Sequence, residues 1–151
     1  MTSRASTFEF LSALAKKKTI PVGSLVQDPI DDDDENSKIM QWLNEKPRAS
    51  RVFVSFGSEC FLSKEEMLEI AHGLDYSNVN HIWVIRFPGG EKTSVERALP
   101  EGYLDKVKGK GLILEGWAPQ AKILAHPSIG GFVCQCGWSS IMESITFGYA
   151  T

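Results

Sequence analysis

The residues best suited to chemistry lie together near the C-terminal end of the 151-residue sequence. The stretch from Gly137 to Ser140 forms a predicted strand–turn–helix junction, and free backbone N–H groups at the start of a helix bind anions. The hydroxyls of Ser139 and Ser140 add donors, and hydrogen bonds to charged groups contribute about 1.5–3 kcal/mol each. Ser139 could instead be a simple N-cap without a ligand. The junction therefore predicts a phosphate or diphosphate site.

Two further side chains could complete a nucleotide site. Glu143 lies four residues after Ser139 on the same helix face, where its carboxylate could accept hydrogen bonds from both ribose hydroxyls. It could also simply complement the helix dipole. Trp117 directly follows a predicted strand and could stack on a base for roughly 1–3 kcal/mol, although tryptophan at a strand end also serves in packing. Only the joint order and spacing of these residues favours a nucleotide diphosphate.

The elements that must position these residues alternate between strands and helices, which predicts an α/β fold with a Rossmann-like parallel sheet and flanking helices. Three predicted strand ends, at Gly57-Ser58, Gly116-Trp117 and Cys136-Gly137-Trp138, should meet at one crevice, because ligands of such sheets lie beyond the carboxyl ends of the strands. The predicted strands are 52–56, 81–87, 111–115 and 129–135. The predicted helices are 7–18, one capped by Ser37 that ends before Pro47, one after a Ser63/Glu66 capping box, 120–125 and 139–147, with a polar loop around 99–103.

Composition excludes several classes of protein. The net charge of −3 and the pI near 5.6 argue against a nucleic-acid binder. No apolar run approaches the roughly 20 residues of a membrane span, and the N-terminus lacks a secretory apolar core. Three cysteines without a CxxC pair predict no disulfide framework. Cys134 and Cys136 should share one face of a strand as small buried residues. We expect a cytoplasmic protein.

Other residue clusters have structural interpretations. The acidic run Asp31–Asp34 could suggest a metal site, but like charges in sequence repel one another and favour a solvated loop. No metal or cofactor is expected. His72, His81 and His126 are interpreted as structural, since their predicted positions are a helix, a strand start and a residue before proline. The turn after the first strand lacks GxGxxG, which argues against a dinucleotide oxidoreductase.

The C-terminal stretch resembles a known family. Trp117-Ala118-Pro119-Gln120, His126-Pro127, Gly130-Gly131-Phe132, and Cys136 to Ser140 followed by Glu143 are similar to the signature box of plant secondary-product UDP-glycosyltransferases (glycosyltransferase family 1). The similarity extends over about Pro21 to Gly148. It implies part of the C-terminal, donor-binding half of a GT-B fold. The expected division is a lead-in helix at 1–20, a linker with an acidic loop and short helix at 21–50, and the partial donor domain at 51–151.

The resemblance also implies roles for individual residues. Trp117 would stack on uracil, the backbone of Ala118 would meet the base edge, and Gln120 would support the same pocket. Glu143 would hold the ribose, and the remaining residues would surround the pyrophosphate. The ten donor-binding residues expected on this basis are Ser58, Trp117, Ala118, Gln120, Gln135, Gly137, Trp138, Ser139, Ser140 and Glu143.

The sequence departs from the family pattern in ways that limit what the resemblance carries over. Gln135 replaces the usual histidine; glutamine can donate a hydrogen bond to a phosphate oxygen but never carries charge. The family's distal Asp/Glu-Gln pair and its whole acceptor domain, with the histidine base, are not in this sequence, so we expect a truncated chain that is inactive alone. The Ser139-Ser140 pair, where the family often has Asn-Ser, resembles the branch that extends the sugars of glycosides.

The expected function is thus the donor-binding portion of a UDP-dependent, inverting glycosyltransferase. The expected partners are a UDP-sugar, with UDP-glucose as the family default, and a small-molecule or glycoside acceptor only with the missing domain. Two alternatives stay open. One is a non-catalytic nucleotide-binding or interaction module, which could self-associate through an open sheet edge. The other is a non-functional truncated product that exposes apolar surface.

Overall fold

The computed structural model of the chain describes residues 4–20, 26, 34–90 and 93–149. The strands are β1 (Arg51–Ser55), β2 (His81–Ile85), β3 (Gly111–Glu115) and β4 (Ile129–Val133). The helices are α1 (Arg4–Ala15), α2 (Asp34–Asn44), α3 (Lys64–Ser77), α4 (Val95–Ala98), α5 (Tyr103–Val107), α6 (Gln120–Ala125) and α7 (Trp138–Phe147).

The four strands form one parallel sheet in the order β3-β2-β1-β4. Val52 of β1 lies opposite His81 of β2 on one side and opposite Gly131 of β4 on the other. The carboxyl ends of all four strands therefore lie at the same edge of the sheet, and the strand order matches the start of a doubly wound fold. The predicted α/β class and parallel sheet are confirmed.

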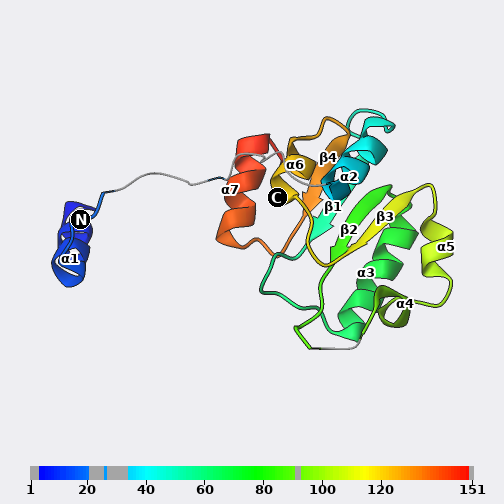
Figure 1. The fold of residues 1–151 in the computed structure, drawn as a ribbon, viewed down its shortest axis with the longest axis horizontal. Coiled ribbons are helices and arrows are strands. Elements are labelled where there is room, and N and C mark those ends of the chain that lie inside the picture. Colours follow the sequence, from blue (N-terminus) through cyan, green and yellow to red (C-terminus); the bar gives the residue numbers. More distant parts are fainter. Residues whose placement is uncertain (1–3, 21–25, 27–33, 91–92, 150–151) are drawn as a thin grey trace.

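Helices cover both faces of this sheet (Figure 1). Because side chains alternate along a strand, Phe53 and Ile82 enter one apolar cluster, which α2 and α6 complete. Val54 and Trp83 enter the other, which α3, α4 and α5 complete. The rings of Phe53 and Phe132 stack with their centroids 5.2 Å apart, which joins β1 to β4 directly beneath the carboxyl edge. Helix α1 lies outside these layers (Figure 1).

Several predicted elements are confirmed closely. The third strand and the helix at 120–125 have the predicted bounds, and the Ser63/Glu66 capping box is present. The final helix ends at Gly148, which adopts a left-handed conformation with φ 79°. The strands predicted to reach residues 56, 87 and 135 end at Ser55, Ile85 and Val133, before the glycine-containing turns that follow them.

Other predictions were wrong. Ser37 is not the N-cap of the second helix, because that helix already begins at Asp34. Asp34 is thus helical rather than part of a loop, and the rest of the acidic run, 31–33, lies outside the described residues. The predicted loop is present at 99–102, but the two short helices that it joins, α4 and α5, were not predicted; they bury Ala98, Tyr103 and Val107 in the second cluster. The first helix begins at Arg4 and ends at Ala15, not at residues 7 and 18.

The cysteine prediction was also wrong. Strand β4 ends at Val133, and Cys136 adopts φ 57° in the turn that follows. Cys136 is exposed whereas Cys134 is partly buried against the first cluster, so the two do not share a buried strand face. The turn bends the chain back, and the Cys136 N–H donates to Cys134 Sγ at 3.3 Å. The expected divisions at residues 20 and 50 remain predictions, since much of the segment between them lies outside the described residues.

Candidate functional site

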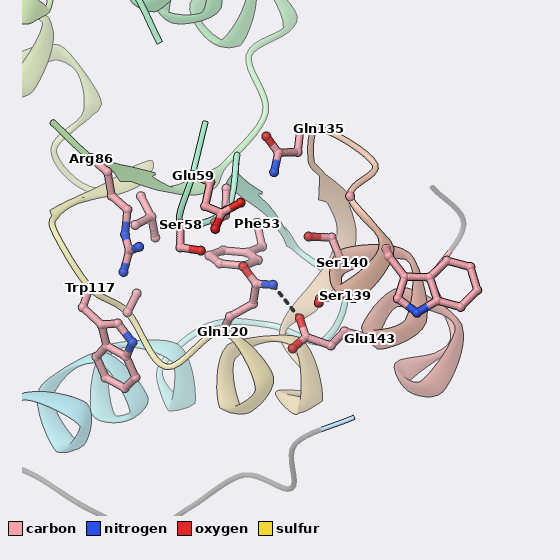
Figure 2. Close-up of a pocket in the computed structure, with 16 residues that line it drawn as sticks. Phe53, Ser58, Glu59, Arg86, Trp117, Gln120, Gln135, Ser139, Ser140 and Glu143 are labelled. Atoms are coloured by element: carbon pink, nitrogen blue, oxygen red, sulfur yellow. Dashed lines mark hydrogen bonds between the residues drawn. The ribbon is translucent and has the colours of Figure 1, made fainter. Parts of the chain in front are cut away.

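A pocket of ≈ 540 Å³ opens at the carboxyl edge of the sheet. Figure 2 shows side chains from the ends of β1, β2, β3 and β4 and from α6 and α7 around it. All ten residues predicted from the sequence line this pocket. The complete lining is Phe53, Ser55, Gly57, Ser58, Glu59, Val84, Arg86, Trp117, Ala118, Gln120, Gln135, Gly137, Trp138, Ser139, Ser140 and Glu143.

One side of the pocket is the N-terminus of α7. Gly137 is the N-cap, with φ −62° and ψ 152°, and it supplies no side-chain cap. The first helical hydrogen bond runs from the N–H of Ile141 to Gly137 O at 3.0 Å, so the three preceding N–H groups have no intrahelical acceptor. Ser139 is not the N-cap, so its hydroxyl does not serve as the cap of α7. The arrangement presents backbone donors and the positive end of a helix dipole to the pocket.

A hydrogen-bonded pair links α6 to α7 inside the pocket. Gln120 Nε2 donates to Glu143 Oε2 at 2.5 Å (Figure 2). The two residues are 23 positions apart in sequence, but each belongs to a helix that begins at the carboxyl edge of the sheet. The bond fixes one carboxylate oxygen of Glu143 and leaves the second as an acceptor. An ionised carboxylate oxygen has lone pairs that can accept further hydrogen bonds.

The Trp117 indole is open to the pocket. Its side chain follows Gly116, which adopts φ 86° at the end of β3. Trp117 is 66% exposed, whereas the next residues, Ala118 and Pro119, pack into or against the protein. Such exposure is inconsistent with a core-packing role for the indole. Its ring face is available to stack on a planar ligand.

Gln135 meets the turn after β1. A Cβ atom placed on Gly57, which adopts φ 78°, would lie 2.9 Å from Gln135 Nε2. Two turns that follow neighbouring strands therefore pack together, and only glycine fits at position 57 without movement of the amide. Gln135 also lies next to Gly137 and lines the pocket.

Sequence reasoning missed several lining residues, most importantly Glu59 and Arg86. Arg86 directly follows β2, and Glu59 lies in the turn after β1. The rule that ligands lie at the carboxyl ends of parallel strands could therefore have predicted both residues. Arg86 Nε donates to Gly116 O at 3.0 Å. Phe53, Ser55 and Val84 are strand residues near that edge, and their pocket contact depends on the packing of the helices.

The histidines lie elsewhere. His81 is 2% exposed, and its Nδ1 lies 3.1 Å from Val79 O; burial lowers its pKa below the ordinary value. His126 bridges Ser128 Oγ at 2.8 Å and Asn44 Oδ1 at 3.0 Å, and burial lowers its pKa too. His72 is exposed on α3. These positions agree with structural roles, and the pocket lining contains no histidine among the described residues.

Within the ranges 4–20, 34–90 and 93–149, no cluster of three His, Cys, Asp or Glu side chains is placed to hold a metal ion. None of the helices in that same part of the chain has the length and apolar character needed to cross a bilayer.

Comparisons with known proteins agree with the geometry. The family model "UDP-glucoronosyl and UDP-glucosyl transferase" matches residues 25–150. The beta-D-glucosyl crocetin beta-1,6-glucosyltransferase of Gardenia jasminoides is 56% identical over 142 residues, which cover 93% of this chain and 32% of that protein. A mogroside IIIx synthase of Siraitia grosvenorii is 57% identical over 143 residues, with 93% and 32% covered.

Solved structures show the same fold. Phytolacca americana UGT2 complexed with UDP-2fluoro-glucose and pterostilbene matches with a TM-score of 0.74 and 39% identity, over 94% of this chain and 31% of that one. A UGT transferase from Siraitia grosvenorii in complex with UDP matches with a TM-score of 0.75 and 34% identity, over 95% and 34%. The chain spans about a third of the length of these relatives. It belongs to the UDP-glucoronosyl and UDP-glucosyl transferase family.

Proposed function

We propose that this chain forms the donor-nucleotide site of a UDP-dependent glycosyltransferase, with UDP-glucose as the preferred donor. The observation that carries the proposal is the convergence of an open indole, a fixed carboxylate and an uncapped helix N-terminus in one pocket. Family membership supports the choice of ligand, because two similar structures contain UDP or a UDP-glucose analogue. The relatives' names support glucose, since one is a glucosyltransferase.

Each part of the pocket suits one part of the ligand. The Trp117 indole stacks on uracil, and the free oxygen of Glu143 accepts hydrogen bonds from the ribose. The N–H groups at the start of α7, with the hydroxyls of Ser139 and Ser58, bind the diphosphate. As the bond from the sugar carbon C1 to the diphosphate breaks, negative charge grows on the leaving group. Donors already held in place stabilise that charge without reorganisation.

The proposed reaction inverts the sugar carbon by direct displacement, with an acceptor hydroxyl as the nucleophile. That hydroxyl needs a base. No histidine lines the described pocket, and the two lining carboxylates have other surroundings: Glu143 is bonded to Gln120 and Glu59 is exposed. We therefore propose that the 151-residue chain binds the donor but does not turn it over. A sugar hydroxyl of a glycoside is the proposed acceptor, which the name of one relative, a beta-D-glucosyl crocetin beta-1,6-glucosyltransferase, supports.

Calorimetric titration with UDP tests the proposal. We expect saturable binding by the chain and a loss of roughly 5- to 100-fold in affinity for Trp117→Ala, the range that follows from stacking of a base on an aromatic ring. Tyr76→Ala is the matched control, because Tyr76 is 95% exposed on α3 and is not a lining residue. Absence of UDP binding by a chain with a cooperative thermal transition would reject the donor-site proposal.

The edge of the sheet supports a second candidate, an interaction module. Strand β4 is the last strand at one side of the described sheet, and Val133 on it is 45% exposed. Unpaired strand edges associate readily. Light scattering that shows a concentration-dependent dimer, abolished by Val133→Lys, would favour this candidate; a monomer that binds UDP would favour the donor site alone.

A further inference from the structure

We propose that Arg86 is a positioning residue that holds the Trp117 turn in its nucleotide-binding conformation. This inference rests on the proposed donor site. Arg86 is not among the ten residues expected from the sequence, and the family resemblance gave it no role. Arg86 directly follows β2, lines the pocket and contacts the turn from the neighbouring strand.

The contact continues the sheet beyond its last regular pair. Ile85 of β2 lies opposite Glu115 of β3, and the Gly116 N–H donates to Ile85 O at 2.9 Å. In a continued parallel ladder, the Gly116 carbonyl would next accept a backbone N–H from the β2 side. Instead, Arg86 Nε donates to this carbonyl at 3.0 Å. A side-chain donor thus replaces the backbone donor at the point where the two strands separate.

The Trp117 turn depends on such a bond. Gly116 adopts φ 86°, and Trp117 itself is 66% exposed, so packing of the indole cannot hold the turn. On the far side, Pro119 is buried and Ala118 packs against the first cluster. The backbone around Trp117 is therefore fixed from one side by packing and from the other by Arg86. Figure 2 shows the guanidinium extending toward the indole.

A direct role in charge neutralisation predicts different behaviour. A cation that contacts the diphosphate favours ligands with more phosphate charge, and its contribution falls as salt rises. A positioning residue acts through the base-stacking indole, so its effect does not depend on the number of phosphates. The bond to Gly116 O occupies Nε, and the site of contact lies beside Trp117 rather than at α7. We therefore assign the positioning role.

The test compares Arg86→Met with wild type for UMP and UDP by calorimetry at low and high salt. We expect affinity for both ligands to fall by the same factor, about three- to tenfold, as for loss of one hydrogen bond, and this factor to be independent of salt. Arg86→Lys, which keeps the charge and a long stem, should show a similar loss, and it replaces Arg86→Met if that variant does not fold. In a Trp117→Ala background, Arg86→Met should cause no further loss.

A second readout needs no ligand. In ¹⁵N NMR of the free protein, Arg86→Met should lower the heteronuclear NOE at the backbone amides of Gly116, Trp117 and Ala118 and leave other residues unchanged. Unchanged dynamics there would overturn the inference, even if wild type failed to bind UDP and the donor-site proposal had thereby failed. A larger loss for UDP than for UMP, full retention in Arg86→Lys, or an additive loss in the double variant would also overturn it.

Discussion

Two helices begin at the carboxyl edge of the sheet, and their N-termini are built differently. Helix α3 follows β1, and its first turn is closed by its own side chains: the Glu66 N–H donates to Ser63 Oγ at 3.2 Å, and the Ser63 N–H donates to Glu66 Oε2 at 2.7 Å. Helix α7 follows the neighbouring strand β4, and its N-cap is Gly137. Glycine has no side chain that could accept hydrogen bonds from the first N–H groups of the helix. At a capped N-terminus, a nearby side chain accepts hydrogen bonds from the first N–H groups. Without such a cap, these N–H groups remain available to a ligand.

The surroundings of the two termini agree with this difference. A hollow of ≈ 410 Å³ lies beside the start of α3, but its walls include Phe61, Met67 and Phe87. The Glu66 carboxylate already occupies the place that an anion would take there. The pocket at α7, by contrast, is lined by polar side chains from three strand-end turns. The presence of a helix N-terminus is therefore not sufficient for a site, and the capping residue decides whether it is available.

Gly137→Asp should reverse this property of α7 and have the largest effect. The carboxylate of an aspartate N-cap would accept hydrogen bonds from the free N–H groups and would lie at the proposed diphosphate position. We therefore expect the affinity for UDP to fall by roughly 100-fold, as for the loss of one or two charge-assisted hydrogen bonds. The free energy of unfolding should rise by only about a few tenths of a kcal/mol, because glycine is itself a favourable N-cap and the backbone at Gly137 already has N-cap geometry. Calorimetry and denaturant unfolding measure the two effects.

Gly137→Ala is the control for this variant. Its Cβ would lie 3.4 Å from Gln135 Nε2, the mobile end of a side chain, so it should fit with little movement. We expect UDP affinity within a few-fold of wild type. If the alanine and aspartate variants lose affinity equally, the loss comes from crowding at Gly137, and the comparison of the two helices fails.

Ser63→Ala should have the opposite profile and a smaller effect. It removes one half of the capping box of α3, so the free energy of unfolding should fall by about 1 kcal/mol. UDP affinity should not change, because Ser63 does not line the nucleotide pocket. Chemical denaturation and calorimetry on the same preparation provide both values. A weaker UDP affinity would mean that α3 contributes to the site after all.

Gln135→His should give the smallest effect and would sharpen the account of α7. Gln135 lies beside Gly137, and a histidine there can carry a positive charge toward the diphosphate. We expect UDP affinity to increase several-fold, and more at about pH 6 than at about pH 8, since the ordinary pKa of histidine is about 6.5. Equal affinities for the two proteins at both pH values would rule out a role for position 135 in binding phosphate charge.

Much of the site could be predicted because its residues are close together in sequence. The stretch from Trp117 to Glu143 contains nine of the ten predicted residues, and the family resemblance, together with local rules for strand ends and helix starts, indicated them; all nine line the pocket. Their roles toward a nucleotide stay predictions. Arg86 was missed because its contact with Gly116 exists only once β2 and β3 are known to be neighbours.

The errors in the fold have a related cause. Helices α4 and α5 contain four and five residues, too short to be stable alone, and they form because Leu99, Tyr103 and Val107 are buried against the sheet. A periodicity test cannot detect such elements. Cys136 was expected to share a strand face with Cys134 because the two are two residues apart, whereas its positive φ places it in the turn that leads into α7. That turn brings Gln135 and Gly137 to the turn after β1.

The strand order gives the pocket a place in the folding process. Val52 pairs with His81 across the connection that contains α3, but with Gly131 only after the chain has continued through α3, α4, α5 and α6. Pairings between residues distant in sequence carry a larger entropic cost and form slowly. The pocket needs turns from both β1 and β4, so it can exist only after that last pairing. Under the proposed donor-site function, UDP binding would therefore report completion of folding rather than collapse.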